Sequence, residues 1–348
     1  MINGLVQSVG FRPFICRMAA KHGLFGEVEN RTSGVYVLVQ GDINTIDRFS
    51  NDIIHNAPPA AHIKSIEINP KQLTGYNSFK ITRSKYVDNQ ITEISPDIAV
   101  CHECLDDLLN DPRRIDYPFI NCTNCGPRFT IIEGLPYDRT MTTMKNFRMC
   151  RDCNSEFRNI LDRRFHAQPI ACNYCGPIYR YEDSVKSFGG IKQIMEAASE
   201  QIVSGKTVAI KGLGGYHLMC DALNNNAVRE MRQRKQRDLK PFAVMFRDIS
   251  AVKKYCFVDE AEATEISSWR RPIVILKHRK ELSPAISNGL NTTGAMLPYM
   301  PFHYMLFKTI ETPAVVFTSG NISDEPVTGE TGEVTDETKT TKTFKLVA

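Results

Sequence analysis

The chain has 348 residues, of which 42% are hydrophobic and 24% charged, and its formal net charge is +4. These proportions are ordinary for soluble globular proteins, and the length is enough for two or three domains with separate cores. No apolar run approaches the ~20 residues needed to cross a bilayer, which excludes a membrane-spanning helix. Nothing resembles a secretory signal, so we expect a cytoplasmic protein with reduced thiols.

Residues 1–83 suggest the order strand, helix, strand, strand, helix, strand. The first helix carries Pro13 in its first turn, where proline is tolerated, and Gly23 ends it. Valines alternate along residues 35–39 as one buried strand face. The expected strands are 2–6, 25–30, 35–40, 63–69 and 78–82, and the second helix is 43–56. This is a ferredoxin-like plan of the α+β class.

The loop at 7–12, between the first strand and the first helix, is an anion site by its geometry. Successive backbone N–H groups and the positive end of the helix face a negative group, and Arg12 can bind that group with two hydrogen bonds. Alone, the pattern is weak evidence, because many loops precede helices and many arginines are only solvated.

Two stretches of this domain resemble the acylphosphatase family, namely residues 6–12 (VQSVGFR) and 29–35 (ENRTSGV). The resemblance implies that Arg12 binds the acyl phosphate and that Asn30 orients the attacking water. Ser8 stands where the family usually has glycine. We therefore expect the loop at 7–12, which we call the phosphate loop, to be more crowded than in the family.

Four C-x2-C pairs fall between residues 101 and 175. The spacing between pairs is 17 residues in the first half and 18 in the second, and the second and fourth pairs run on into Gly-Pro. This is a tandem repeat with a period of about 50 residues. Four thiolates at such spacing suit tetrahedral zinc, with two ligands from each pair. The repeat predicts two structural zinc ions, one held by Cys101, Cys104, Cys122 and Cys125 and one by Cys150, Cys153, Cys172 and Cys175.

A disulfide framework is the alternative for these cysteines, and it fits poorly in a reducing cytosol. His166 lies shortly before the last pair and could be a ligand. Four cysteines are already available for each metal, so a supporting or packing role is expected for this histidine. Cys16, Cys220 and Cys256 have no partner at metal spacing and are expected to be buried thiols.

From residue 187 the pattern changes to alternating helices and strands, the α/β part of the chain. Apolar residues at helical spacing predict a helix from 191 to 202. Residues 207–211 form a buried strand that runs into a glycine-rich loop, 212–218. That loop lacks the Walker spacing, and it either lets a ligand approach the backbone closely or is a plain tight turn. Further strands are expected at 242–246, 273–276 and 314–317.

The segment 229–241 holds six basic and two acidic residues. A solvated helix face is the ordinary explanation, and contact with phosphate or RNA is the more specific one. The last expected strand ends in residues 318–321 (TSGN), at the sheet edge where α/β proteins usually bind ligands.

Five stretches of this half resemble the YrdC family of nucleotide-binding domains: 211–218, 235–241, 271–274, 296–299 and 318–321. The resemblance implies ATP and an acyl-adenylate as ligands, with Mg²⁺ accompanying ATP. It places the nucleotide at Lys211, Lys235, Arg237, Lys240, Ser319 and Asn321.

An acylphosphatase-like domain, two zinc modules of four cysteines each and a YrdC-like domain in this order resemble the HypF family, the carbamoyltransferases that mature nickel–iron hydrogenases. The predicted boundaries are 1–83, 84–186 and 187–327, followed by a disordered polar tail at 328–348. The C-terminal transferase domain of the family is absent and the YrdC-like domain incomplete. We therefore expect a fragment, a truncated product or a reduced relative.

The resemblance implies that carbamoyl phosphate is hydrolysed at the first domain and that ATP adenylates the carbamate at the YrdC-like domain. The carbamoyl group then passes to a cysteine of HypE. Two other functions remain open from the sequence. One is a zinc-stabilised protein that binds double-stranded RNA through the basic helix at 229–240, and the other is an inactive truncated product.

Overall fold

The computed structural model describes residues 1–86, 93–183, 185–280 and 282–321. Contacts divide the chain into two compact units. The first unit contains residues 1–98 and 121–176, and the second contains residues 99–120 and 177–348. The polar tail predicted at 328–348 lies outside the described residues, as does the end of the predicted third domain.

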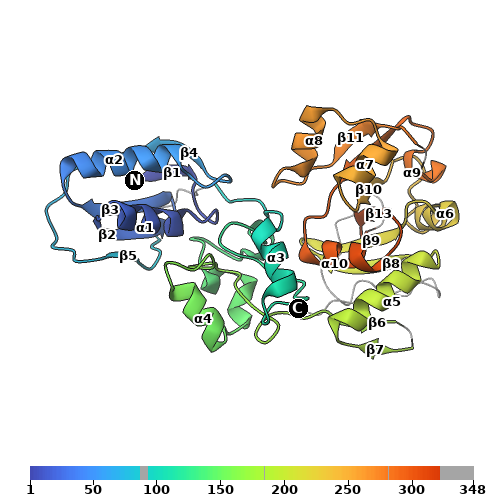
Figure 1. Cartoon of the computed structure of the whole chain (residues 1–348), viewed down its shortest axis with the longest axis horizontal. Coiled ribbons are helices and arrows are strands. Elements are labelled where there is room, and N and C mark those ends of the chain that lie inside the picture. The colour runs from blue at the N-terminus through green and yellow to red at the C-terminus, as the bar shows by residue number, and fades with distance from the viewer. Residues whose placement is uncertain (87–92, 184, 281, 322–348) are drawn as a thin grey trace. The chain divides into compact units, whose positions relative to one another are not determined.

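The first unit contains a five-stranded sheet in the order β4-β1-β3-β2-β5 (Figure 1, blue). Neighbouring strands are antiparallel, except that β5 runs parallel to β2. The order β4-β1-β3-β2 is that of the ferredoxin-like plan predicted from the sequence, and β5 extends the sheet beyond β2. The strands are β1 (Ile2–Leu5), β2 (Phe25–Arg31), β3 (Gly34–Gln40), β4 (His62–Ile66) and β5 (Phe79–Ile81).

Helices α1 (Phe11–Lys21) and α2 (Ile43–His55) contact each other and share a core with this sheet. Gly23 follows α1 with a φ of 64°, the left-handed conformation that glycine adopts without strain at a helix end. The side chain of Asp42 caps α2 by accepting a hydrogen bond from the N–H of Thr45. The stop of the first helix was predicted from Gly23, and the structure adds the cap of the second helix at Asp42.

Residues 121–176 of the first unit contain little regular structure. They form three short 3-10 helices, η1 (Phe129–Ile131), η2 (Arg139–Met141) and η3 (Thr143–Asn146), and one α-helix, α4 (Arg151–Arg158). Buried backbone carbonyls in such a segment need donors from elsewhere. Two buried arginines, Arg128 and Arg164, supply several of them.

The second unit contains a six-stranded sheet in the order β11-β12-β10-β13-β9-β8 (Figure 1). Only β10 and β12 pair in parallel, and the other neighbours are antiparallel. The strands are β8 (Val208–Gly212), β9 (Gly215–Asp221), β10 (Ala243–Phe246), β11 (Val274–Lys277), β12 (Thr292–Met296) and β13 (Ala314–Ser319). A separate two-stranded sheet pairs β6 (Tyr181–Glu182) with β7 (Ser187–Phe188).

The second unit also contains seven helices among its described residues. They are α3 (His102–Asn110), α5 (Ile191–Val203), α6 (Asn225–Arg234), α7 (Ile249–Tyr255), α8 (Glu260–Ser267), α9 (Pro284–Ser287) and α10 (Pro301–Thr309). Of these, α6, α7, α8 and α9 share an apolar core with the six-stranded sheet, while α5 and α10 contact each other. Across the described ranges, no helix combines the length and the apolar character that a membrane crossing requires.

The glycine-rich segment at 212–218 is a hairpin rather than a loop. Gly212 pairs with Gly215, so only Leu213 and Gly214 form the turn between β8 and β9. Gly214, the second residue of the turn, has a φ of 80°, the positive φ that a type II turn needs at this position and that glycine supplies. The tight turn that the sequence left open is therefore present, and close approach of a ligand to these glycines stays a prediction.

The basic segment is not one helix. α6 ends at Arg234, and the φ of Gln236 is 48°, a left-handed conformation that stops the helix from continuing. The buried guanidinium of Arg232 then donates to the carbonyls of Lys240 and Ala285 and folds the following loop back on the helix end. The continuous basic helix at 229–240, on which the RNA alternative depended, was wrong.

Candidate functional site

The loop between β1 and α1 presents unpaired backbone N–H groups. Gly10 precedes α1 in the left-handed conformation, with φ 77° and ψ 14°. Within the part of the chain that the structure describes, the N–H groups of residues 8–12 donate to no protein acceptor. Unpaired N–H groups at the start of a helix attract anions, because they add to the positive end of the helix dipole.

Ser8 adopts a φ of 60° in this loop, a region where glycine is free of strain and serine is not. The glycine that the acylphosphatase resemblance implies at this place would therefore adopt this conformation without strain. The Ser8 hydroxyl donates to the carbonyl of Gln7 at 2.6 Å, so it is held by the loop itself. The side chain still borders the hollow beside the loop.

Arg12 is 6% exposed and bound to three groups of its own unit. Its Nη1 donates to Ser84 Oγ at 3.2 Å, and its Nη2 donates to the carbonyl of Tyr137 at 3.1 Å and to Asp138 Oδ1 at 2.9 Å. A guanidinium carries five N–H donors. Nε and the second N–H of Nη1 have no acceptor among the described residues, so the group keeps donors for a ligand.

Asn30 lies on β2, is 1% exposed, and donates from Nδ2 to the same Tyr137 carbonyl at 3.2 Å. Arg12 and Asn30 therefore share one backbone acceptor and lie together. Asn30 Oδ1 is buried and has no hydrogen-bond partner in the described residues. An unpaired buried amide oxygen costs about 1–3 kcal/mol, which a water or a ligand donor bound there would remove.

A hollow opens beside these groups, with about 320 Å³ of space that protein atoms do not occupy, part of it continuous with solvent. One wall is the loop at 7–12, with Arg12 and Asn30. The other wall comes from residues 121–176, which sequence reasoning did not connect with this site. Its members are Thr123, Arg128, Tyr137, His166, Ala167 and Gln168.

His166 packs between two aromatic rings, with ring centroids 4.7 Å from both Phe157 and Phe165. Neither of the cysteine groups found in the described residues includes it, so the packing role expected from the sequence is the one observed. Burial, with a further contribution from the nearby Arg12 charge, lowers the pKa of His166 to about 4. The ring is therefore neutral near pH 7 and adds no charge to the hollow.

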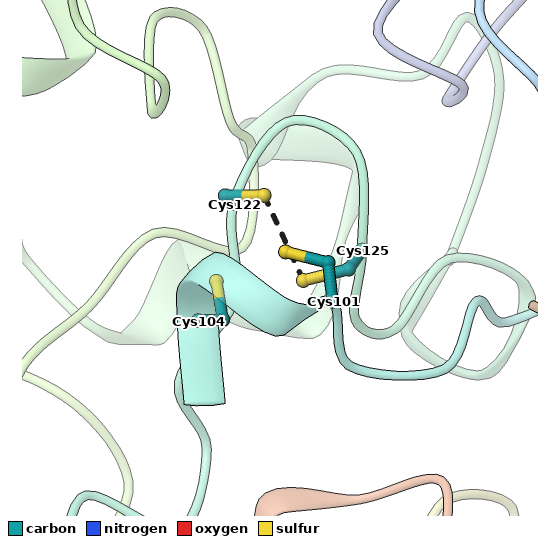
Figure 2. Close-up of side chains that lie close together, drawn as sticks. All are labelled: Cys101, Cys104, Cys122 and Cys125. Atoms are coloured by element: carbon teal, nitrogen blue, oxygen red, sulfur yellow. Dashed lines mark hydrogen bonds between the residues drawn. The ribbon is translucent and has the colours of Figure 1, made fainter. Parts of the chain in front are cut away.

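The eight repeated cysteines form two groups, Cys101–Cys104–Cys122–Cys125 and Cys150–Cys153–Cys172–Cys175, each with all sulfur atoms within 4.8 Å of one another. Figure 2 shows the four sulfurs of the first group facing one another. Zinc–sulfur bonds of about 2.3 Å in a regular tetrahedron separate the sulfurs by about 3.8 Å. Several measured separations match, from 3.7 Å for Cys122–Cys125 to 3.9 Å for Cys150–Cys172. The residues therefore fit two zinc ions, grouped as the repeat predicted.

The two halves of the repeat share local geometry. Cys101 directly precedes α3, and Cys150 directly precedes α4. Backbone N–H groups point at the sulfurs, as from Asn124 to Cys122 at 3.4 Å and from Cys153 to Cys150 at 3.5 Å. Such N–H groups stabilise thiolate charge, which a zinc ligand needs.

The remaining cysteines are Cys16, Cys220 and Cys256, and all three are free and buried, as expected. Burial raises the pKa of Cys16 and of Cys256 to about 11, and it raises the pKa of Cys220 as well. These thiols are therefore protonated at neutral pH and poor nucleophiles.

Three of the predicted nucleotide residues meet in the second unit. Lys235 is 3% exposed, and its Nζ donates to the carbonyls of Ser319 at 2.6 Å and Asn321 at 2.5 Å. Burial, with repulsion from Arg237, lowers the pKa of Lys235 to about 8. This lysine therefore holds the end of β13 to the end of α6.

The other predicted nucleotide residues make contacts of their own, although Arg237 lies close enough to Lys235 to affect its pKa. Arg237 donates to the carbonyls of Lys240 and Pro241 in its own loop. Lys240 is exposed. Lys211 lies on β8, with its Nζ 5.9 Å from the ring centroid of Tyr216. The triphosphate contacts assigned to these three cations stay predictions.

Family models match three parts of the chain. The acylphosphatase family matches residues 1–81, the HypF finger family matches residues 100–132 and 149–181, and the Sua5, YciO and YrdC family, described as telomere recombination, matches residues 200–346. An acylphosphatase of Archaeoglobus fulgidus is 35% identical over 81 residues, which are 23% of this chain and 90% of that protein.

Two curated relatives match nearly the whole chain. The carbamoyltransferase HypF of Rhodobacter capsulatus is 39% identical over 326 residues, 93% of this chain and 43% of the relative. The probable carbamoyltransferase HypF of Methanocaldococcus jannaschii is 39% identical over 340 residues, 96% of this chain and 44% of the relative. The chain thus spans less than half the length of these relatives.

Two solved structures are similar over 95% of the chain. One is a full-length HypF in a phosphate- and nucleotide-bound form, with a TM-score of 0.90 and 46% identity, of which this chain covers 44%. The other is the T. kodakarensis HypF, with a TM-score of 0.86 and 44% identity, of which it covers 43%. The three family models match the chain in the domain order predicted from the sequence. The curated relatives and the solved structures match nearly the whole chain. The chain belongs to the HypF carbamoyltransferase family.

Proposed function

We propose that this chain performs the first two steps of carbamoyl transfer in the HypF family. It hydrolyses carbamoyl phosphate at Arg12 and Asn30, and it adenylates the released carbamate with ATP in the second unit. The observation that carries the proposal is the hollow of the first unit, where unpaired N–H groups, spare donors of Arg12 and the unpaired Asn30 Oδ1 lie together.

The first step needs an anion site and an oriented water. The phosphoryl oxygens bind the N–H groups of residues 8–12 and Arg12, which neutralise the charge that shifts onto the phosphoryl group during transfer. Asn30 Oδ1 accepts a hydrogen bond from a water and directs its oxygen at phosphorus. The new P–O bond forms as the bond from phosphorus to the carbamoyl oxygen breaks, and the water proton passes to a phosphate oxygen. The products are inorganic phosphate and carbamate.

The second step follows from the chemistry of carbamate. Because carbamate is unstable in water, it must be captured soon after release. One carbamate oxygen attacks the α-phosphorus of ATP, and the bond to the β-phosphate breaks to release pyrophosphate. We place the nucleotide beside Lys235, Ser319 and Asn321, the predicted residues that lie together, with Lys211, Arg237 and Lys240 as further contacts. Mg²⁺ accompanies the triphosphate, since it binds chiefly through substrate phosphates.

The two zinc ions have a structural role in this proposal. They fold residues 121–176, which form the second wall of the hollow although they contain little regular structure. The acceptor of the carbamoyl group in this proposal is a cysteine of a HypE-type protein. Eleven free cysteines suit a reducing compartment, so we place the protein in the cytoplasm.

Hydrolysis of carbamoyl phosphate and of acetyl phosphate by purified protein tests the first step. Arg12→Ala is expected to lower kcat/KM by about 10²–10³-fold, the usual effect of removing a group that binds developing charge. Asn30→Ala should lower kcat with a smaller change in KM, because Asn30 acts on the water. Equal activity in wild type and Arg12→Ala would remove the site assignment.

A further inference from the structure

We propose that the second cysteine pair, Cys122–Cys125, is the support of the phosphate loop, and that Arg128 is the positioning residue that ties the two together. The inference deepens the proposed function, because it concerns the same hollow. It makes phosphate affinity in the first unit depend on the zinc-binding segment.

Arg128 is 2% exposed, and all five of its N–H donors are engaged by backbone carbonyls. Nη1 donates to Cys125 at 3.1 Å and Pro127 at 2.9 Å, and Nη2 donates to Cys122 at 3.3 Å and Thr123 at 2.8 Å. The fifth donor, Nε, binds the carbonyl of Ser8 in the phosphate loop. Although Arg128 borders the hollow, it has no N–H left for a substrate, so it acts on the loop and not on the anion.

The hydrogen bond to the Ser8 carbonyl sets the direction of a backbone N–H group that can donate to phosphate. In a planar trans peptide the C=O and the following N–H point in opposite directions. The peptide that carries the Ser8 carbonyl also carries the Val9 N–H, which is one of the unpaired donors. Holding the carbonyl on Arg128 therefore turns the Val9 N–H away from Arg128. Without that bond, the left-handed conformation of Ser8 loses a constraint that opposes its strain.

A second contact joins the same two segments. A methyl group added at Gly10 would lie 2.9 Å from Thr123 Cγ2 and 3.0 Å from Asn124 Oδ1. The turn between the two cysteines thus packs closely against the loop at the residue that precedes α1. Thr123 is fixed in turn by its hydroxyl, which donates to the carbonyl of Phe165 at 3.0 Å, beside His166 in the far wall. The loop, the cysteine pair and the wall form one continuous contact within the first unit.

The consequence is a link from zinc to phosphate. Cys122 and Cys125 are fitted to hold zinc, and their own carbonyls are two of the acceptors that orient Arg128. When zinc leaves, the turn between these cysteines loses its metal support, so the carbonyls that orient Arg128, and with them the donor to the Ser8 carbonyl, are held less firmly. Metal loss should therefore weaken phosphate binding, although no zinc ligand touches the phosphate.

The test measures the Kd of inorganic phosphate by calorimetry on the full chain, with zinc content determined for each sample. Arg12→Ala first assigns the binding to this hollow. Arg128→Lys keeps the charge but cannot bind five carbonyls. We expect it to raise the Kd of phosphate at least tenfold while the zinc content stays unchanged. Arg232→Lys is the matched control, because Arg232 is also buried and bound to several carbonyls, in the second unit. It should bind phosphate like the wild type.

A second arm covers the case in which Arg128→Lys fails to fold. Wild-type protein is titrated with a zinc chelator, and the phosphate Kd is followed as zinc is removed and then restored. We expect affinity to fall with zinc loss and to return with zinc. Wild-type affinity in Arg128→Lys, or in zinc-depleted wild type, would overturn the inference. Failure of wild type to bind phosphate in an Arg12-dependent way would remove the proposed function itself.

Discussion

Replacing Asp138 by asparagine should tighten phosphate binding in the first unit. The Asp138 carboxylate lies 2.9 Å from Arg12 Nη2, with its side chain 29% exposed. It therefore places a negative charge beside the group that must bind a dianion. Arg12 should keep its position in the variant, since Tyr137 and Ser84 still accept hydrogen bonds from it and the new amide oxygen can do the same.

The size of the effect follows from Coulomb's law. A phosphoryl oxygen on the opposite side of the guanidinium would lie roughly 7 Å from the carboxylate, where unit charges repel by about 0.6–2.4 kcal/mol for effective dielectric constants of ~80 to ~20. Partial exposure favours the lower part of this range, about 1 kcal/mol, or a roughly fivefold lower Kd.

The assay is calorimetry with inorganic phosphate at low salt, where screening is weak. Glu133→Gln is the control, because it removes the same charge from an exposed ion pair with Lys145 that does not line the hollow. Its phosphate Kd should stay within about twofold of wild type, as surface pairs contribute little. Weaker phosphate binding in Asp138→Asn would mean that the carboxylate positions Arg12, and the reasoning from charge would be refuted.

Two further predictions concern the metal and the nucleotide. Freshly reduced protein should contain two zinc ions per chain by elemental analysis, and one zinc or none would contradict the cysteine grouping. Chelation of zinc should expose the amides of residues 121–176 to hydrogen exchange before those of the five-stranded sheet. ATP affinity should fall as pH rises through about 8, because the pKa of Lys235 is lowered to about 8 and only the protonated amine attracts phosphate. Lys235→Arg should keep its affinity to higher pH, and an identical fall in both proteins would assign the titration elsewhere.

The parts that the sequence predicted well have local signals. Alternating valines and a helix stop at Gly23 are such signals in the ferredoxin-like unit. The cysteine groups follow from spacing, since two C-x2-C pairs give four thiolates whatever the fold between them. Arg12 and Asn30 were named from short motifs, and in the structure both side chains donate a hydrogen bond to the carbonyl of Tyr137.

The second wall of the hollow had no such signal. Arg128 and Ser8 are 120 positions apart, and nothing in either stretch indicates that they meet. Residues 121–176 lack the periodicity from which helices and strands are read. His166 was considered only in relation to zinc, because it lies shortly before the last cysteine pair, whereas its neighbours in space include Arg12.

Two segments of the second unit could not be settled from the sequence. The glycines at 212–218 were compatible with a tight turn or with close approach of a ligand, and they include a two-residue hairpin turn. The basic segment read as one helix to residue 240, but α6 ends at Arg234 because a left-handed Gln236 and the carbonyl contacts of Arg232 define the loop. Backbone conformation at single residues decided both cases, and composition does not report it.

Carbamoyl-phosphate-dependent exchange of labelled pyrophosphate into ATP tests most directly whether one chain carries out both steps. Wild type should exchange only when carbamoyl phosphate is present. Arg12→Ala should lose the exchange with Lys235 intact, because no carbamate is made, and Lys235→Ala should lose the exchange while still hydrolysing carbamoyl phosphate. Exchange that persists in Arg12→Ala, or that proceeds without carbamoyl phosphate, would contradict the coupling of the two sites.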